Sequence, residues 1–213
     1  SKGEFLITLM SSLAQEESRS ISENVQWGQR KRFADGKASL AYSRFLGYDK
    51  GPNKYEMVVN EEQALTVKKV FRLFLQGYTP HTIANIMTAD SEKSASGITN
   101  WNDRTVQYML SNEKYKGDAL LQKYFMVDYL QKKTKKNEGE LPQYYVEGDH
   151  EPIIDPWLFD YVQTVLQNRL LIDSRYSGVG VLSTKVMCGK CGAYFGPRPW
   201  HSTSYNNLVW QCR

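Results

Sequence analysis

Three cysteines near position 213 are the residues whose type and spacing indicate chemistry most directly. Cys188 and Cys191 form a C-x2-C pair flanked by Gly189 and Gly192, a spacing at which a tight turn directs two thiolates toward one tetrahedral zinc ion. Cys212 follows at about the interval that separates the two halves of a four-cysteine zinc site. The sequence therefore predicts that Cys188, Cys191 and Cys212 bind a structural Zn²⁺ ion.

The identity of a fourth ligand stays open in the sequence. His201 lies between the two cysteine groups, in a PWHSTSY segment rather than at zinc-knuckle spacing, so we expect a cysteine beyond residue 213 instead. Two alternatives need no metal. The cysteines are unrelated free thiols, or the C-x2-C pair is a redox centre, although the usual βαβ surroundings are missing. Three cysteines do not suit a disulfide framework, so we expect a reducing, intracellular compartment.

A second group of side chains has the chemistry of nucleic-acid recognition. Asn102 is predicted to cap a helix that buries Val106, Met109 and Leu110. The polar residues on its other face are Arg104, Thr105, Gln107 and Tyr108. Arginine pairs with guanine and glutamine with adenine, while hydroxyl groups bind phosphate. The pattern therefore favours a DNA-recognition helix.

With the predicted helix at residues 79–89, this helix resembles a helix-turn-helix, whose second helix enters the major groove. The intervening TADSEKSASGITNW is longer than the usual turn. An equal alternative is therefore that three helices pack a core and expose polar residues to solvent.

Positive charge is concentrated between residues 28 and 54, which contain seven lysines and arginines and two aspartates. The first four of these cations are predicted DNA contacts: Arg30, Lys31, Arg32 and Lys37. Three later cations are predicted contacts as well: Lys114, Lys116 and Arg198. The alternative is an ordinary solvated segment, since the net charge of +4 for the whole chain barely favours an anionic partner.

The composition excludes several other classes of protein. With 213 residues and 41% apolar content, the chain can bury one sizeable core with small satellites. No apolar run approaches the roughly 18 residues of a membrane span, and FLITLMSSLA lacks the flanks of a signal peptide. The histidines are scattered and no phosphate-binding loop or nucleophile elbow is present. We therefore expect a cytoplasmic protein without catalytic residues in this chain.

The elements that must position these residues indicate an α+β fold. A helix is predicted over residues 3–35, and its length indicates that much of it packs against a partner or another domain. Short strands are expected before residue 60. Four more helices are predicted from their starting residues: Asn60, Thr79, Asn102 and Asp155. Alternation over residues 116–146 predicts a β-hairpin with QKKTKKNEGE as its tip, and glycines and serines beyond Ser174 predict a linker to a zinc ribbon.

Taken in order, these motifs resemble the large serine recombinases, the integrases and resolvases of phages and mobile elements. LMSSLAQEESRSISENVQWGQRKRFADGK resembles the end of their catalytic domain. FLGYDKG through HEPIIDPWLFDYVQ resembles their recombinase domain, and CGKCG with the later cysteine resembles their zinc ribbon. The resemblance implies a connecting helix in residues 1–36, a DNA-binding recombinase domain in residues 37–174, and a partial zinc ribbon domain in residues 175–213.

The resemblance also implies a function. In this family a serine in an amino-terminal domain attacks a DNA phosphodiester, which gives a 5′-phosphoserine link before strands are exchanged within a tetramer. This chain has no match to the Tyr-x-Arg-x-Ser nucleophile motif, since AYSRF at 41–45 has the wrong order. We therefore expect the DNA-binding part of a bacterial, phage or transposon recombinase. It would be inactive alone, bind double-stranded attachment half-sites, and form a homodimer or tetramer in the full-length protein.

Two other classes of function stay open. The chain could be an assembly module that uses its first thirty residues to contact other subunits, with only incidental charge. It could also be a self-sufficient nuclease, which the missing serine argues against.

Overall fold

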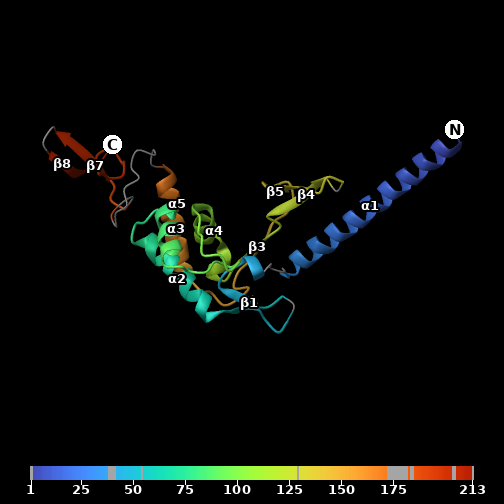
Figure 1. The fold of residues 1–213 in the computed structure, drawn as a ribbon, viewed down its shortest axis with the longest axis horizontal. Coiled ribbons are helices and arrows are strands. Elements are labelled where there is room, and N and C mark those ends of the chain that lie inside the picture. Colours follow the sequence, from blue (N-terminus) through green and yellow to red (C-terminus); the bar gives the residue numbers. More distant parts are fainter. Residues whose placement is uncertain are drawn as a thin grey trace. The chain divides into compact units, whose positions relative to one another are not determined.

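The computed structural model describes residues 2–37, 42–53, 55–128, 130–171, 182, 185–202 and 205–212. It contains helices and small antiparallel sheets, so the predicted α+β class is confirmed (Figure 1). The chain forms two compact units, one of residues 1–39 and 118–149 and the other of residues 40–117 and 150–213. This division differs from the three consecutive domains expected from the sequence, because the first unit combines an amino-terminal helix with a later hairpin.

The helical core of the second unit consists of four helices, α2 (Glu61–Leu75), α3 (Pro80–Ala89), α4 (Asp103–Ser111) and α5 (Pro156–Leu171). The first three begin after a residue whose side chain accepts a hydrogen bond from a first-turn N–H group. The accepting residues and their distances are Asn60 at 3.1 Å, Thr79 at 3.2 Å and Asn102 at 2.8 Å. These bonds satisfy N–H groups that a helix leaves without intrahelical partners. The predicted helix starts are therefore confirmed.

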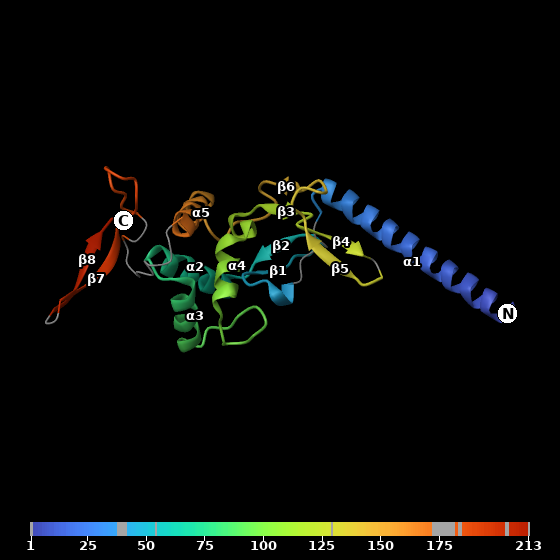
Figure 2. The same cartoon turned by 90° about the horizontal axis from the view of Figure 1, so that it is seen from above.

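Figure 2 shows the ribbon of α2, α3, α4 and α5 from a second side. Apolar side chains at three- and four-residue spacing on these helices pack into one core. The buried residues from the four helices include Val67, Val70, Phe71, Phe74, Ile83, Met87, Val106, Met109, Leu110, Phe159, Val162 and Val165. Burial of a side chain of this size contributes about 1.5–3 kcal/mol. The core therefore fixes which face of each helix points to solvent, including the polar face of α4.

A short two-stranded sheet, β1 (Tyr48–Lys50) with β2 (Met57–Val59), precedes α2 and follows the 3-10 helix η1 (Tyr42–Arg44). Gly47 enters β1 with φ +99°, and a Cβ atom there would lie 2.6 Å from Cδ1 of Ile153. Glycine meets both constraints because it has no side chain. A second 3-10 helix, η2 (Glu113–Lys116), follows α4.

The loop between α3 and α4 is longer than a helix-turn-helix turn, but hydrogen bonds of Trp101 hold it in place. Trp101 is buried, its main-chain N–H donates to Oγ1 of Thr88 at 3.0 Å, and its indole N–H donates to the carbonyl oxygen of Glu92 at 2.8 Å. α3 and α4 consequently pack against each other despite the long connection. The length of this loop therefore does not by itself exclude a helix-turn-helix.

The first unit contains α1 (Lys2–Ala34) and four strands, β3 (Ala119–Leu121), β4 (Tyr124–Asp128), β5 (Lys133–Lys136) and β6 (Tyr144–Val146). β3 pairs with β6 and β4 with β5, both antiparallel. The hairpin predicted within residues 116–146 is confirmed. The prediction that all of QKKTKKNEGE forms its tip is wrong, because residues 133–136 pair with β4 as a strand.

The long helix predicted over residues 3–35 is confirmed as α1, and no residue of it is buried. Its large apolar side chains are exposed: Phe5, Leu6, Ile7, Leu9, Met10, Leu13, Ile21, Val25 and Trp27.

The carboxyl-terminal region contains a hairpin of β7 (Gly196–Ser202) and β8 (Tyr205–Gln211), in register from Gly196 opposite Gln211 to Ser202 opposite Tyr205. The predicted linker after Ser174 lies outside the described residues as far as position 181.

Candidate nucleic-acid interface and metal site

α4 presents the polar residues that the sequence selected. Arg104 and Gln107 are exposed, and Tyr108 is 58% exposed. Thr105 is half-buried, and its hydroxyl donates to Oδ1 of Asn102 at 3.1 Å. The structure therefore brings the four predicted recognition residues onto one short helix whose other face is anchored in the core.

A hollow of ≈ 340 Å³ lies beside the start of α4 and is lined by residues that include Arg44, Asn100, Asn102 and Thr105. Arg44 is exposed and places a cation there. Arg44 belongs to the cationic segment of residues 28–54 but is not among the contacts predicted from the sequence. Its position beside α4 depends on the fold of η1 against the helical core, which the charge pattern does not reveal.

Two of the lysines that are predicted to contact DNA form ion pairs within the protein. The side chain of Lys114 is only 9% exposed, and its Nζ lies 3.1 Å from Oε1 of Glu113. Nζ of Lys116 lies 3.1 Å from Oδ1 of Asp160 and 5.8 Å from the ring centroid of Phe159. Either lysine would have to give up these contacts to reach a phosphate. That these two lysines contact DNA stays a prediction. The observed geometry disfavours it most for Lys114, because that side chain is buried.

The cations at the end of α1 are accessible. Arg30, Lys31, Arg32 and Lys37 are all exposed. Nζ of Lys31 lies 5.4 Å from the ring centroid of Trp27, a cation–π contact that directs the side chain without neutralising it. Arg30 lines a hollow of ≈ 350 Å³ together with other residues of α1, with Tyr124 of β4 and Thr134 of β5, and with Gln122, which lies between β3 and β4. The predicted cationic segment is therefore available for an anionic partner.

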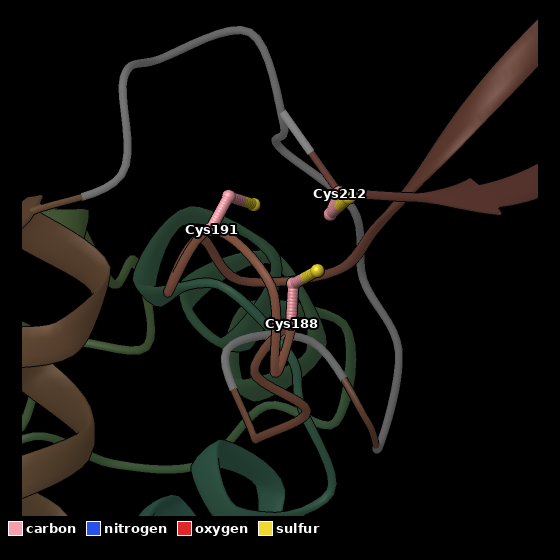
Figure 3. Close-up of side chains that lie close together, drawn as sticks. All are labelled: Cys188, Cys191 and Cys212. Atoms are coloured by element: carbon pink, nitrogen blue, oxygen red, sulfur yellow. The ribbon is translucent and has the colours of Figure 1, made fainter.

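The three cysteines converge in space, as the spacing predicted (Figure 3). The ligand atoms of Cys188, Cys191 and Cys212 lie within 4.8 Å of one another. The turn that joins the first two is closed by hydrogen bonds from the N–H of Cys188 to the carbonyl of Ala193 at 2.8 Å, and from the N–H of Gly192 to the carbonyl of Cys188 at 2.9 Å. Cys212 follows β8. The arrangement is compatible with three of the four ligands of a tetrahedral zinc ion.

The electrostatics of the cluster suit a cation. N–H groups of Cys191 and Lys190 lower the pKa of the Cys188 thiol to about 7, and metal ligation requires the thiolate form. The pKa of the Cys212 thiol is raised to about 11, mainly because its side chain is hydrogen-bonded to Cys188, and the negative charge of the neighbouring thiolates adds a smaller repulsion. A dication is the group that would relieve this repulsion.

Two residues of the sequence analysis cannot be assigned a geometry. The backbone of Arg198 and of the alternative ligand His201 lies in β7, but their side chains are outside the described part of the structure. Gln163 is a positioning residue that the sequence analysis missed. Its amide on α5 donates to the carbonyl oxygen of Leu110 on α4 at 2.7 Å, and no local pattern predicts such a contact between helices.

Comparison with known proteins identifies the family. The sequence profile of the Recombinase family matches residues 61–169, more than half of the chain. The chain therefore belongs to the Recombinase family, which confirms the resemblance seen in its motifs. A putative DNA recombinase of Bacillus subtilis (strain 168) is 24% identical over 225 residues, an alignment that covers 100% of this chain and 44% of the relative.

Among solved structures, the fold is similar to a crystal structure of an LSR–DNA complex. The TM-score is 0.52 at 20% identity, and the match covers 89% of this chain and 55% of the other. A structure from work on the Listeria innocua prophage attP site has a TM-score of 0.47 at 21% identity, covering 89% of this chain and 73% of the other. The chain thus spans about half the length of the recombinase and of the complex subunit that it matches.

In the described part of the chain, no helix is both long and apolar enough to cross a membrane.

Proposed function

We propose that this chain binds double-stranded DNA sequence-specifically at attachment sites, as the carboxy-terminal region of a serine site-specific recombinase. The observation that carries the proposal is the polar face of α4. Arg104, Gln107 and Tyr108 project from a capped helix that is anchored in a core belonging to the Recombinase family. A short helix with such side chains near its amino end suits insertion into a major groove.

The proposed binding mode assigns different tasks to different side chains. Arg104 and Gln107 read base edges, while Thr105 and Tyr108 bind phosphate. The cationic segment from Arg30 to Lys37 follows the minor groove next to the site of α4. The ribbon around β7 and β8, where Arg198 is located, reaches a further major groove. The domain limits proposed for these tasks remain 1–36, 37–174 and 175–213.

The full-length protein would recombine and integrate DNA through a phosphoserine intermediate, with the nucleophilic serine in another region. This assignment is supported by family membership and by the putative DNA recombinase of Bacillus subtilis. The present chain supplies binding and positioning, and is expected to leave supercoiled plasmid DNA uncut. Cytoplasmic action on bacterial, phage or transposon DNA follows from the same proposal.

The metal proposed for the cysteine cluster is a structural Zn²⁺ ion held by Cys188, Cys191 and Cys212. Their thiol groups fit this metal because thiolate sulfur is a preferred ligand of zinc and the three ligand atoms already lie close together. The ion would cross-link the turn at 188–191 to the end of β8. Its fourth ligand stays the cysteine predicted beyond residue 213.

The DNA-binding proposal is tested with duplexes that the chain itself selects from a random pool. Fluorescence anisotropy would compare a selected duplex with its shuffled counterpart between about 50 and 200 mM salt. We expect tighter binding to the selected duplex, with log affinity falling by about 0.9 per phosphate contact for each decade of salt. Equal, weak binding to both duplexes at low salt would contradict the proposal.

A second candidate is an assembly function, which is favoured by the exposed apolar side chains of α1. Phe5, Leu6, Leu9 and Leu13 are all exposed on this helix, and apolar surface of this kind marks protein contacts. The homodimer or tetramer expected for the full-length protein would use it. Sedimentation velocity over a range of concentrations distinguishes the two: assembly predicts dimers without DNA, whereas DNA binding predicts a shift only when duplex is added.

A further inference from the structure

The β4–β5 hairpin displays a run of lysines that its own folding does not require. Lys132 precedes β5, and three of the four residues of β5 are lysines: Lys133, Lys135 and Lys136. Every residue of β5 is exposed. Lysine is depleted in strands because it packs poorly on a pleated surface, and neighbouring ammonium groups repel one another. Strand stability therefore does not explain the run.

Charge is sharply segregated along this part of the chain. Residues 123–136 contain five lysines and one aspartate, whereas residues 137–149 contain four acidic residues and no lysine or arginine. The hairpin is thus strongly cationic even though the net charge of the whole chain is only +4. A local field of this kind attracts a polyanion to one segment.

Three of the five lysines have no ionic or hydrogen-bonded partner in the part of the chain that the structure describes. Lys135 pairs with Glu140. Among the described residues, no ion pair or hydrogen bond of the side chain of Lys132, Lys133 or Lys136 is present. These three lysines retain their full capacity to bind an external anion.

The pairing of the strands determines where the lysines point. Lys136 lies opposite Tyr124 and Lys135 opposite Phe125. Lys133 lies opposite Asp128, after an irregularity in β4 between Met126 and Asp128. Because successive side chains of β5 alternate between its faces, Lys133 and Lys136 project from opposite faces of the ribbon. Both sides of the hairpin therefore carry a lysine without a partner among the described residues.

We propose that the β4–β5 hairpin is a second DNA-contacting element, whose Lys132, Lys133 and Lys136 bind backbone phosphates of the duplex. The inference rests on the proposed DNA-binding function and adds a site outside α4 and the basic end of α1. A two-stranded ribbon fits the width of a DNA groove, and lysines on both faces match the two phosphate chains that border it. Lysine binds phosphate as a point charge, so this element contributes affinity and orientation without reading sequence.

The main alternative is that the lysines only protect exposed strand edges. An edge lysine discourages pairing with another chain, and such a role needs no nucleic acid. The two explanations differ in the salt dependence of DNA binding, because only phosphate contacts release counterions from the duplex.

The test uses the 213-residue chain and the triple variant Lys132→Gln/Lys133→Gln/Lys136→Gln. The matched control, Lys2→Gln/Lys68→Gln/Lys93→Gln, removes the same charge at three exposed lysines elsewhere. Anisotropy titrations across salt would be run with the selected and the shuffled duplex, and with an RNA duplex as competitor. Circular dichroism and melting temperature would verify that both variants fold.

We expect the hairpin variant to lose affinity for both DNA duplexes by the same factor. Its salt slope should be shallower by about 2 to 3, which corresponds to roughly 0.9 for each lost phosphate contact. The control should keep the slope of the unsubstituted chain. A hairpin variant that matches the control on DNA would overturn the inference, as would unchanged DNA binding combined with weaker RNA competition. If the unsubstituted chain itself binds neither duplex, the proposed function fails instead.

Discussion

Gln163 on α5 holds the end of α4 through one hydrogen bond, in which its Nε2 donates to the main-chain carbonyl oxygen of Leu110 at 2.7 Å. The last carbonyl groups of a helix have no intrahelical partners, and the side chain of Leu110 is fully buried. The contact therefore satisfies a carbonyl at the edge of the core. It also connects α4 to α5.

Replacement of Gln163 by alanine should destabilise the helical core. A buried carbonyl left without its donor costs about 1–3 kcal/mol, so Gln163→Ala should lower the free energy of unfolding by that amount. Chemical denaturation monitored by circular dichroism measures it. Gln167→Ala, on an exposed position of the same helix, is the control and should be nearly neutral. Equal losses of unfolding free energy in both variants would show that the hydrogen bond to Leu110 does not stabilise the core.

Arg104→Ala should change DNA specificity rather than only affinity. A bidentate arginine contact to a base contributes about 1–3 kcal/mol of discrimination, so the variant should tolerate substitutions at one base pair of the selected duplex. Lys31→Ala should instead weaken all duplexes alike and reduce the salt slope by about 1. Competition with a panel of single-base variants makes the comparison. If both variants lost affinity equally for all duplexes, the assignment of α4 as the helix that recognises bases would be wrong.

Removal of the proposed zinc ion should affect the ribbon and spare the helical core. The folding energy of a small zinc module is largely metal-binding energy, so a chelator or Cys188→Ser should release zinc and unfold residues around β7 and β8. Elemental analysis gives the zinc content, and limited proteolysis reports the local unfolding. The melting of α2–α5 should stay unchanged. His201→Ala is the control, and loss of zinc in that variant would identify His201 as the fourth ligand.

Acidification should weaken the contact between α2 and the loop after α3. The hydrogen bond from Lys69 lowers the pKa of Glu92 below its ordinary value of 4.5, with a further contribution from Thr66. Since the folded-state pKa is depressed, the stabilisation is complete above pH 4.5 and is lost as the pH falls through that lower value. Lys69 also contacts Asp90 at 2.9 Å, so the acidic pair shares one cation.

Glu92→Gln should therefore reduce stability near neutral pH and converge with the unsubstituted chain in acid. For a partly exposed ion pair the expected loss is about 0.2–1 kcal/mol. Thermal melts at several pH values measure the difference, with Glu147→Gln as an exposed control. If the difference in stability between the two proteins persisted unchanged at low pH, packing of the Glu92 side chain, and not its charge, would explain the effect.

Features with a local cause were predictable from the sequence. Asn60, Thr79 and Asn102 cap helices because a short polar side chain reaches the N–H groups of the next turn. The buried stripes of these helices follow from three- and four-residue spacing. The cysteine cluster follows from a C-x2-C turn, although the approach of Cys212 also needed the pairing of β7 with β8.

Features that depend on distant segments were decided only by the tertiary structure. Lys133–Lys136 is a strand because β4 pairs with it, whereas its composition indicated a solvated tip. Lys114 resembled a free cation in the sequence, but the fold buries it beside Glu113.

Capping, periodicity and motif order act over a few residues, so the helix starts, the candidate zinc ligands and the family could be read from the sequence alone. Which cations remain exposed, and how Trp101 and Gln163 fix α4, became known only from the packed fold. These depend on burial and on hydrogen bonds between segments far apart in the chain, whose energies no local pattern contains.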